Sequence, residues 1–265
     1  MVDAGVERRG RWRGFRVDQV SRHLHFAHSE HVNWAVYVGD DGVTLIDSGY
    51  PGQRDLLVAS LVEVGCRPED VSAVLITHGH VDHLGGAAWL AEEHGTPVFA
   101  HADEVENVNR SEMEQAGSWD VVGNILRPGV LPWAVAILPL VGIHSKLGVP
   151  SVAPLPMLDD GRVAVPGRPR ARLVEGHTTG HTAFDFEEER VLVVGDALAT
   201  RHRTSPLVGP QLLPSVFHHE AGDARASVAN LRSSSARVVL PGHGEACFGP
   251  VDAAVDLALR TGWAW

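Results

Sequence analysis

The chain has 265 residues, 44% of them hydrophobic and 21% charged, which is the range of a globular protein with a sizeable core. Asp and Glu outnumber Lys and Arg by 33 to 22, and the formal net charge is -11. This acidic balance argues against a nucleic-acid-binding protein, because contact with phosphates needs a basic surface. The most apolar stretch, residues 129–143, is too short for a membrane span, which needs about 20 apolar residues.

Two further features bear on the cellular compartment. The first residues, MVDAGVERRGRWRGF, contain no apolar run of the kind found in a secretory signal. Cys66 and Cys247 are far apart and neither belongs to a CxxC motif, so no disulfide framework is implied. We therefore expect a cytoplasmic protein that does not associate with a membrane.

The first part of the chain is expected to alternate strands and helices. Two apolar runs, WAVYV and VTLI, are joined by GDDG, and Asp-Gly between apolar runs is a strong signal for a β-hairpin. Residues 51–65 follow a proline with apolar side chains at helical spacing, and residues 71–78 are a β-branched run typical of a buried strand. The segment LGGAAWLAEEHG predicts a helix that ends at Gly95, followed by a strand at TPVFAH. The predicted order is ββαβαβ.

The rest of the chain contains an irregular middle and a second group of strands. Residues 103–158 are acidic at first and then rich in Pro and Leu, which predicts helices and loops lying over the domain as a lid. Asp103, Glu104 and Glu106 are interpreted as a solvated helix face. The segments ARLVEGH, AFDFEEERVLVVGD and ARVVLPGHG predict strands, with a helix at about 223–232 and a closing helix at VDAAVDLALRTGW. We expect one domain over 1–265, an α/β sandwich with helices outside a two-layer core.

Several predicted strands end at side chains that can bind a metal. Strand ends that gather at one edge of a sheet can pool their side chains, and adjacent glycines let the chain approach an ion closely. These strand ends carry His78, His177, Asp196 and His243, and the first continues into HGHVDH with His80, Asp82 and His83. Imidazole and carboxylate without thiolate suit Zn, Fe, Mn or Ni. Seven ligands are too many for one tetrahedral zinc, but they fit two ions that share a carboxylate.

The motifs HGHVDH, GHTTGH, GDAL and PGHGE, in this order, resemble those of the metallo-β-lactamase-fold hydrolase superfamily. The segment NWAVYVGDDGVTLIDSGYPG is similar to the first hairpin of that family, and the resemblance covers roughly residues 20–250. It implies an αββα sandwich with the active site at one edge of the two sheets.

The resemblance also implies how the ligands are shared between two zinc ions, with iron or manganese as alternatives. One ion would be held by His78, His80 and His177, the other by Asp82, His83 and His243, and Asp196 would bridge them. Asp47 would support the ligand loop through hydrogen bonds. A hydroxide held between the ions would attack a carbonyl or phosphoryl centre, and Asp82 could accept a proton from it.

Other histidines are candidates for the surroundings of the site. GHTTGH offers both His177 and His181, and the family places the ligand at the first, so His181 would line the pocket or fill its wall. His218 and His219 are candidate substrate contacts, because the segment after the GD motif often passes near the site in this family. Weaker candidates for such contacts are His144 and His202, whereas residues 23–31 place their four histidines in a strand and a hairpin loop.

Asp196 within GDAL resembles the glyoxalase II-like and lactonase-like branches, rather than true β-lactamases. The apolar lid indicates an apolar or acyl small-molecule substrate, because ligand pockets are lined mostly by apolar groups. Our hypothesis is a dinuclear zinc hydrolase that cleaves a small ester, lactone or thioester, as a monomer or a homo-oligomer. One alternative is an oxidoreductase similar to persulfide dioxygenases, with one iron bound by His80, His177 and Asp196. The other is a non-catalytic binding protein of the same fold.

Overall fold

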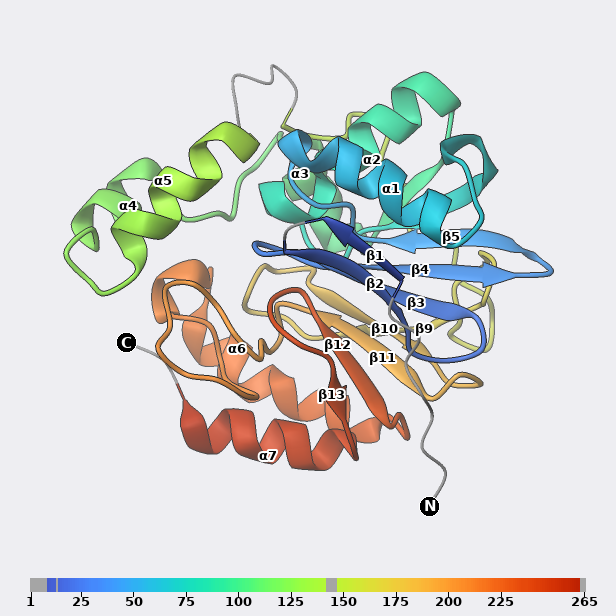
Figure 1. Ribbon diagram of the computed structural model, residues 1–265. Coiled ribbons are helices and arrows are strands. Elements are labelled where there is room, and N and C mark those ends of the chain that lie inside the picture. Colours follow the sequence, from blue (N-terminus) through green and yellow to red (C-terminus); the bar gives the residue numbers. More distant parts are fainter. Residues whose placement is uncertain (1–8, 13, 142–146, 263–265) are drawn as a thin grey trace.

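The computed structural model describes residues 9–12, 14–141 and 147–262 (Figure 1). Its first sheet has eight strands, which neighbour one another in chain order. The first five pair antiparallel, whereas β5 to β8 run parallel. The strands are β1 (Arg9–Trp12), β2 (Phe15–Gln19), β3 (Leu24–His28), β4 (Trp34–Gly39), β5 (Gly42–Ile46), β6 (Val71–Leu75), β7 (Val98–Ala100) and β8 (Ala153–Pro154).

The second sheet has five strands in the order β13-β12-β11-β10-β9. Its neighbours pair antiparallel except for β11 and β12, which run parallel. The strands are β9 (Arg170–Leu173), β10 (Thr182–Phe186), β11 (Val191–Gly195), β12 (Val238–Pro241) and β13 (Cys247–Phe248).

Helices cover the outer face of each sheet. The first sheet is covered by α1 (Arg54–Glu63) and α2 (Val81–His94), and the second by α6 (Ala221–Ser227) and α7 (Val251–Thr261), as Figure 1 shows. Three separate apolar cores fill the spaces between these four layers. The predicted αββα sandwich is therefore confirmed, as are the GDDG hairpin and the helix that ends at Gly95.

The sequence of strand β4 is almost continuously apolar because both faces of the strand are buried. Trp34 and Val36 belong to the core beneath α1 and α2, whereas Ala35 and Tyr37 belong to the core between the two sheets. Successive side chains of a strand point to opposite faces, so a strand with both faces covered needs apolar residues at every position. The same reasoning applies to β11, all of whose residues are buried.

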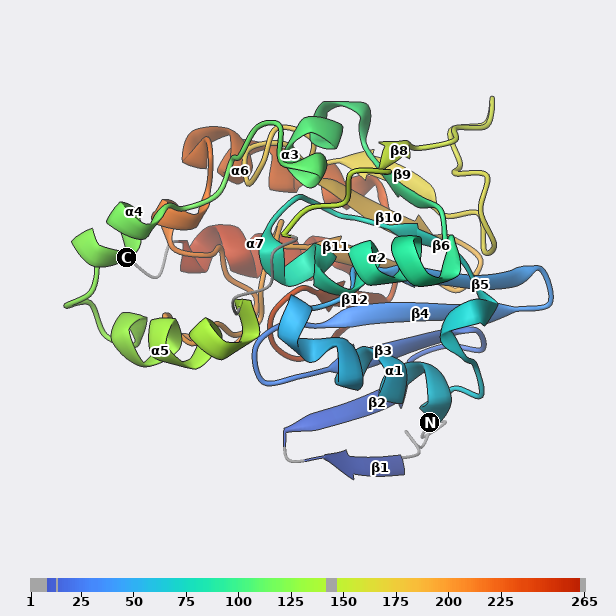
Figure 2. The ribbon, with the colours of Figure 1, turned by 90° about the horizontal axis from the view of Figure 1, so that it is seen from above.

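The middle segment differs in part from its prediction. It contains α3 (Val105–Asn109), α4 (Ser118–Gly123) and α5 (Val130–Val141), and Figures 1 and 2 place α4 and α5 beyond one end of the sandwich. The expectation that residues 103–158 add nothing to the core sheet is wrong at β8, which pairs with β7. A strand of two residues is too short to leave a sequence pattern that predicts it. Within the described residues, no helix has the length and apolar character needed to cross a membrane.

Candidate metal centre

Loops and one helix end, more than strand ends, carry the candidate ligands. Strand β6 stops at Leu75 and β9 at Leu173, so His78 and His177 lie in the loops that follow. Only Asp196 comes directly after a strand, β11. Helix α2 starts earlier than predicted, at Val81, and therefore places Asp82 and His83 in its first turn instead of in a preceding loop.

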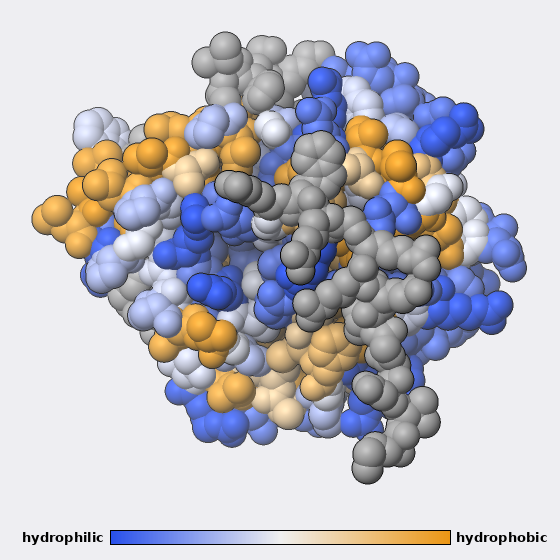
Figure 3. Space-filling model, in the orientation of Figure 1, coloured by the Kyte–Doolittle hydropathy of each residue, from blue (hydrophilic) through white to orange (hydrophobic). Residues whose placement is uncertain are grey.

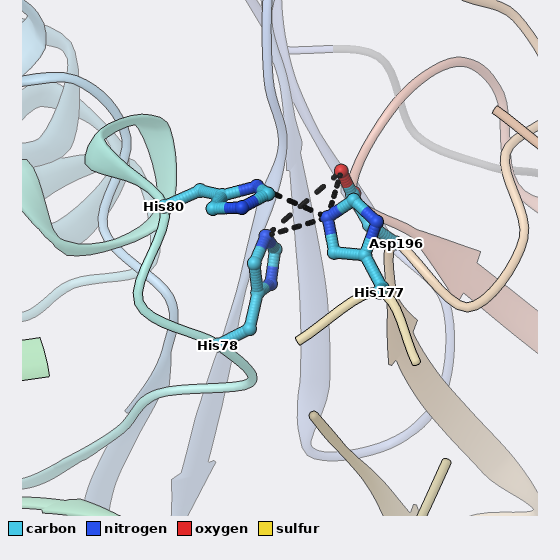
Figure 4. A group of neighbouring side chains, drawn as sticks. All are labelled: His78, His80, His177 and Asp196. Carbon is cyan, nitrogen blue, oxygen red and sulfur yellow. Dashed lines mark hydrogen bonds and ion pairs between the residues drawn. The ribbon is translucent and has the colours of Figure 1, made fainter. Parts of the chain in front are cut away.

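The structure brings the seven candidate ligands together in two groups. One contains His78, His80, His177 and Asp196, and the other contains Asp82, His83 and His243. Within each group the ligand atoms lie within 4.8 Å of one another. His177 Nε2 lies 3.2 Å from His78 Nε2 and 3.0 Å from His80 Nδ1, and Figure 4 shows these three rings and Asp196 converging on one point.

Asp196 lies between the two groups. Its Oδ2 is 3.5 Å from His177 Nε2 in the first group and 3.3 Å from His243 Nε2 in the second. Its Oδ1 is 3.5 Å from His83 Nε2, also in the second group. One carboxylate is thus within reach of the imidazoles of both groups.

Asp47 orients a ligand from each group. Its Oδ2 accepts hydrogen bonds of 2.8 Å from His83 Nδ1 and from the Thr77 hydroxyl. That hydroxyl in turn lies 3.0 Å from His78 Nδ1 and accepts its proton. Both imidazoles therefore carry their proton on Nδ1 and turn Nε2 towards the centre. Asp47 has a φ of 61°, a left-handed conformation that few residues other than Gly, Asn and Asp adopt.

The remaining imidazoles are fixed in the same manner by other partners. His80 Nε2 donates to the Glu114 carbonyl at 2.9 Å, and His243 Nδ1 donates to the His31 carbonyl at 2.6 Å. His177 Nδ1 lies 3.1 Å from His218 Nδ1. Because His218 Nε2 donates to the Leu213 carbonyl, its Nδ1 is the acceptor in this pair. In its neutral form, each candidate imidazole thus presents its other nitrogen as a lone-pair donor for a cation.

The centre has features that fit a bound cation. Among the described residues, His83 Nε2 and Asp196 Oδ1 are buried polar atoms without a hydrogen-bond partner. Burying polar atoms without partners is costly, so such atoms at a ligand cluster indicate a cation site. A Cβ added to Gly242 would lie 2.2 Å from Asp196 Oδ1 and 2.7 Å from His83 Cε1, so only glycine lets the chain pass this close to the centre.

The charges at the centre are unevenly distributed. Burial holds the pKa of His78 and of His177 well below the ordinary value, so both are neutral near pH 7. Burial also opposes protonation of His83, but the surrounding carboxylates, Asp196 first, outweigh it and raise its pKa to about 10. Burial would raise the pKa of Asp196, but the neighbouring His243 and His83 hold it well below its usual range. The carboxylate is ionised and available to a cation.

Glu104 is not on a solvated helix face, and that prediction was wrong. Its side chain is fully buried, and burial raises the pKa of its carboxyl group. One oxygen accepts hydrogen bonds from the Gly79 amide and from Asn107, and the other accepts them from the Thr178 hydroxyl and the Gly180 amide. It therefore joins the loop of His78 and His80 to the loop of His177. An acidic run shows no periodicity that would single out one buried member.

Two further residues near the centre were missed by the sequence analysis. Glu114 accepts hydrogen bonds from the amide and the hydroxyl of Thr179, and its carbonyl holds His80. Tyr50 is buried, and burial together with the nearby charge of Asp82 raises its pKa well above the ordinary value. The only sequence signal for Tyr50 was its place in DSGYPG, three residues after Asp47.

The histidines predicted to contact substrate occupy three different environments. His181 is fully buried and accepts a hydrogen bond from the Asp196 amide at 3.0 Å, a position behind the ligands. His218 is also buried and lies behind His177. His219 is 45% exposed, with its Nε2 3.9 Å from Glu114 Oε1. The geometry therefore favours a supporting role for the first two, and His144 lies outside the described residues.

Comparison with known proteins assigns the family. The family model described as metallo-beta-lactamase superfamily matches residues 30–243, and the chain belongs to this superfamily. It is 30% identical to the probable metallo-hydrolase YflN of Bacillus subtilis over 214 residues, which are 76% of this chain and 74% of that protein. Identity to the probable metallo-hydrolase YybB of the same organism is 27%, over 63% of this chain and 61% of that protein.

Solved structures support the same assignment. A metallo-beta-lactamase family protein from Thermus thermophilus, TTHA1429, is similar with a TM-score of 0.59 and 28% identity, over 86% of this chain and 74% of that one. A B3 metallo-beta-lactamase with an active-site glutamic acid has a TM-score of 0.62 at 18% identity, over 92% of this chain and 86% of that one. The second likeness is one of fold alone. Fold, family and the buried His and Asp cluster together define a metal-dependent hydrolase of this superfamily.

Proposed function

We propose that this protein is a dinuclear zinc hydrolase that cleaves a small ester, lactone or thioester with an apolar acyl part. The proposal is carried by the position of Asp196 between two groups of candidate ligands. Six ligands around one shared carboxylate, seven in all, exceed what a single tetrahedral zinc can use. Ligands without thiolate suit zinc, with iron or manganese as alternatives.

The side chains around the centre hold the ligands in place before any substrate arrives. When bound, two divalent cations supply a water of lowered pKa and polarise a carbonyl oxygen. Asp47 and Glu104 fix the positions of the ligand loops through buried hydrogen bonds. Such rigid support matters because a ligand displaced by even a fraction of an ångström loses affinity and catalytic geometry.

Asp82 is the side chain proposed to accept a proton during the reaction. Its side chain is 14% exposed, and its Oδ2 lies 3.5 Å from His243 Nε2, so it faces the other ligands of its own group while remaining accessible. A carboxylate in this position can take up the proton of the attacking water and deliver it to the leaving group.

The proposal that the substrate carries an apolar acyl group rests on the apolar helix α5, which lies beside the centre. Ile137, Leu140 and Val141 of α5 pack against a small buried cluster formed by Val32, Tyr50 and Val81. Val81 stands between His80 and Asp82 in the sequence, so this cluster adjoins two of the candidate ligands. Substrate that reaches the centre would therefore pass apolar side chains, which favours an apolar or acyl compound over a strongly charged one.

We also propose that the protein acts in the cytoplasm. Cys66 and Cys247 are both free cysteines. Thiols left unpaired fit a reducing compartment better than an oxidising one.

The proposal is tested with protein of known metal content against lactones, thioesters, esters, β-lactams and phosphodiesters. We expect about two zinc per chain by elemental analysis and turnover of at least one carboxylic ester, lactone or thioester. About one iron per chain with oxygen consumption would instead indicate the oxidoreductase. Full zinc occupancy without turnover of any compound would indicate a binding protein.

A further inference from the structure

His181 lies just beyond the end of the ladder between β10 and β11. The two strands pair antiparallel, and the pair nearest this end is Phe184 opposite Val193. Three positions beyond that pair, the same register brings His181 opposite Asp196, the residue between the two ligand groups. The ladder therefore makes neighbours of two residues that are 15 positions apart in the sequence.

The backbone at this end of the ladder does not continue the regular β pattern. The Thr182 amide donates to the Thr77 carbonyl at 2.9 Å, a partner outside the second sheet. Gly195 has a φ of 50°, a left-handed conformation that ends the strand before Asp196. Among the described residues, no backbone carbonyl accepts the Asp196 amide hydrogen. A buried amide needs a partner, so another group has to supply the acceptor.

The side chain of His181 supplies that acceptor. Its Nε2 accepts the hydrogen bond of the Asp196 amide at 3.0 Å, and the ring is fully buried. Burial lowers the pKa of His181 to about 3, so the ring is neutral near pH 7 and Nε2 keeps its lone pair. Because a neutral imidazole carries one proton, that proton is on Nδ1.

The second nitrogen of His181 shows that the ring is not placed for packing alone. Within the part of the chain that the structure describes, Nδ1 is a buried polar atom without a hydrogen-bond partner. An unpaired buried donor lowers stability, so phenylalanine would fill the same space without this cost. What imidazole provides here, and phenylalanine would not, is the acceptor Nε2.

The hydrogen bond joins two segments that both carry candidate ligands. His181 closes the loop that begins at His177, since its amide donates to the Thr178 carbonyl at 3.4 Å. A shift of Asp196 away from this loop would therefore change the 3.5 Å separation of its Oδ2 from His177 Nε2. A Cβ added to Gly195 would lie 2.9 Å from His181 Nε2, so glycine lets the two segments lie this close.

We propose that His181 is a positioning residue for the shared carboxylate: by accepting the Asp196 amide hydrogen, it holds Asp196 between the two ligand groups. The inference rests on the proposed dinuclear function and adds to it a residue that acts through Asp196 and not on the substrate. Without this bond, Asp196 can shift towards one group and away from the other. The protein would then bind its cations more weakly and no longer hold them as a pair.

Three substitutions separate the acceptor from the ring. His181→Gln keeps an acceptor near the position of Nε2, His181→Asn carries the same amide group one bond too short, and His181→Phe keeps a ring without an acceptor. We expect His181→Asn and His181→Phe to lower zinc affinity about 10–100-fold, measured by competition with a chelator, because partners behind metal ligands have effects of this size. His181→Gln should retain most of the affinity. Should His181→Phe not fold, the comparison of His181→Gln with His181→Asn gives the answer.

Cobalt(II) in place of zinc reports on the shared carboxylate directly. Two cobalt ions bridged by one carboxylate are magnetically coupled, and electron paramagnetic resonance detects this coupling. With two cobalt equivalents, the wild type and His181→Gln should show coupled ions, whereas His181→Asn and His181→Phe should show uncoupled ones. A ring needed only for packing predicts the reverse order, with His181→Phe resembling the wild type, and that result would overturn the inference.

The inference and the proposed function fail in different ways. Equal losses of affinity in all three variants, or no loss in His181→Phe, would overturn the role of His181 and leave the hydrolase function standing. One metal ion per wild-type chain would instead overturn the dinuclear function. In that case the affinities of His181→Gln and His181→Asn for this single ion still decide whether His181 positions Asp196.

Discussion

The candidate metal centre and the helices α4 and α5 lie at the same end of the molecule, yet their side chains are packed differently. Six of the seven candidate ligands are buried, and each imidazole is held by a second partner. In contrast, Trp119, Leu126 and Leu138 of the insertion are 86%, 97% and 67% exposed. Figure 3 shows hydrophobic side chains gathered on the surface of this insertion.

This difference has a physical origin. Polar ligands in a buried site are tolerated only when their hydrogen bonds are made, so the centre needs a rigid surrounding framework. Exposed apolar side chains do not need such precise positioning. Proteins nevertheless seldom cluster them on one surface unless that surface binds something. We infer that the framework determines the chemistry and that the insertion determines which compound reaches it.

Loss of a candidate ligand should have the largest effect. We expect His80→Ala and Asp82→Ala each to lower kcat about 10³-fold, because a metal contact to the reacting group is worth several kcal/mol. Both should also lower the zinc content measured by elemental analysis. His94→Ala, at the exposed end of α2, is the control and should behave as the wild type. Unchanged turnover in a variant of verified metal content would contradict the site.

Loss of the buried carboxylate behind the ligands should have the next largest effect. Glu104→Gln keeps the shape but places an amide against donors such as the Gly180 amide and the Thr178 hydroxyl. We expect zinc affinity to fall about 10–100-fold and the free energy of unfolding to fall by about 1–3 kcal/mol. Competition with a chelator and urea denaturation measure the two effects. Glu106→Gln, on the exposed side of α3, is the matched control; equal effects in both variants would contradict the role of Glu104.

The two ligand groups should respond differently to pH. The pKa of His83 is raised to about 10 and that of His243 is also raised, so a cation must displace their protons, and affinity at this group should rise by about tenfold or more per pH unit between pH 6 and 8. Burial keeps His78 and His177 neutral in this range, so the first group should release no proton from them. Zinc calorimetry in buffers of different ionisation enthalpy measures the released protons. Release of the same number by both zinc equivalents would contradict this distinction.

Changes on the exposed face of α5 should have the smallest effect on the centre. Leu131→Ser and Leu138→Ser replace half-exposed or exposed side chains, and we expect unfolding free energies within about 0.5 kcal/mol of the wild type. Zinc content should remain at the wild-type value. A loss of zinc in either variant would show that the insertion supports the centre instead of controlling access to it.

Much of the candidate site could be predicted because its residues stand in short, ordered motifs. HGHVDH places four metal-capable side chains within six positions, and the spacing alone indicates a ligand cluster. The supporting residues carry no such signal. Glu104 sits in an acidic run, and His218 reaches His177 only because the chain returns there after β11. The Glu114 carbonyl that orients His80 is a backbone group, which no sequence pattern identifies.

The sequence by itself determined the alternation of strands and helices, the family and the set of candidate ligands, because periodicity and local spacing are properties of neighbouring residues. Only the tertiary structure decided which nitrogen of each imidazole faces the centre, since that depends on partners from distant segments such as Asp47 and His31. It also decided that Glu104 is buried and that the rings of His202 and Phe217 pack against each other. Burial and hydrogen bonding between remote residues arise only when the four layers pack together.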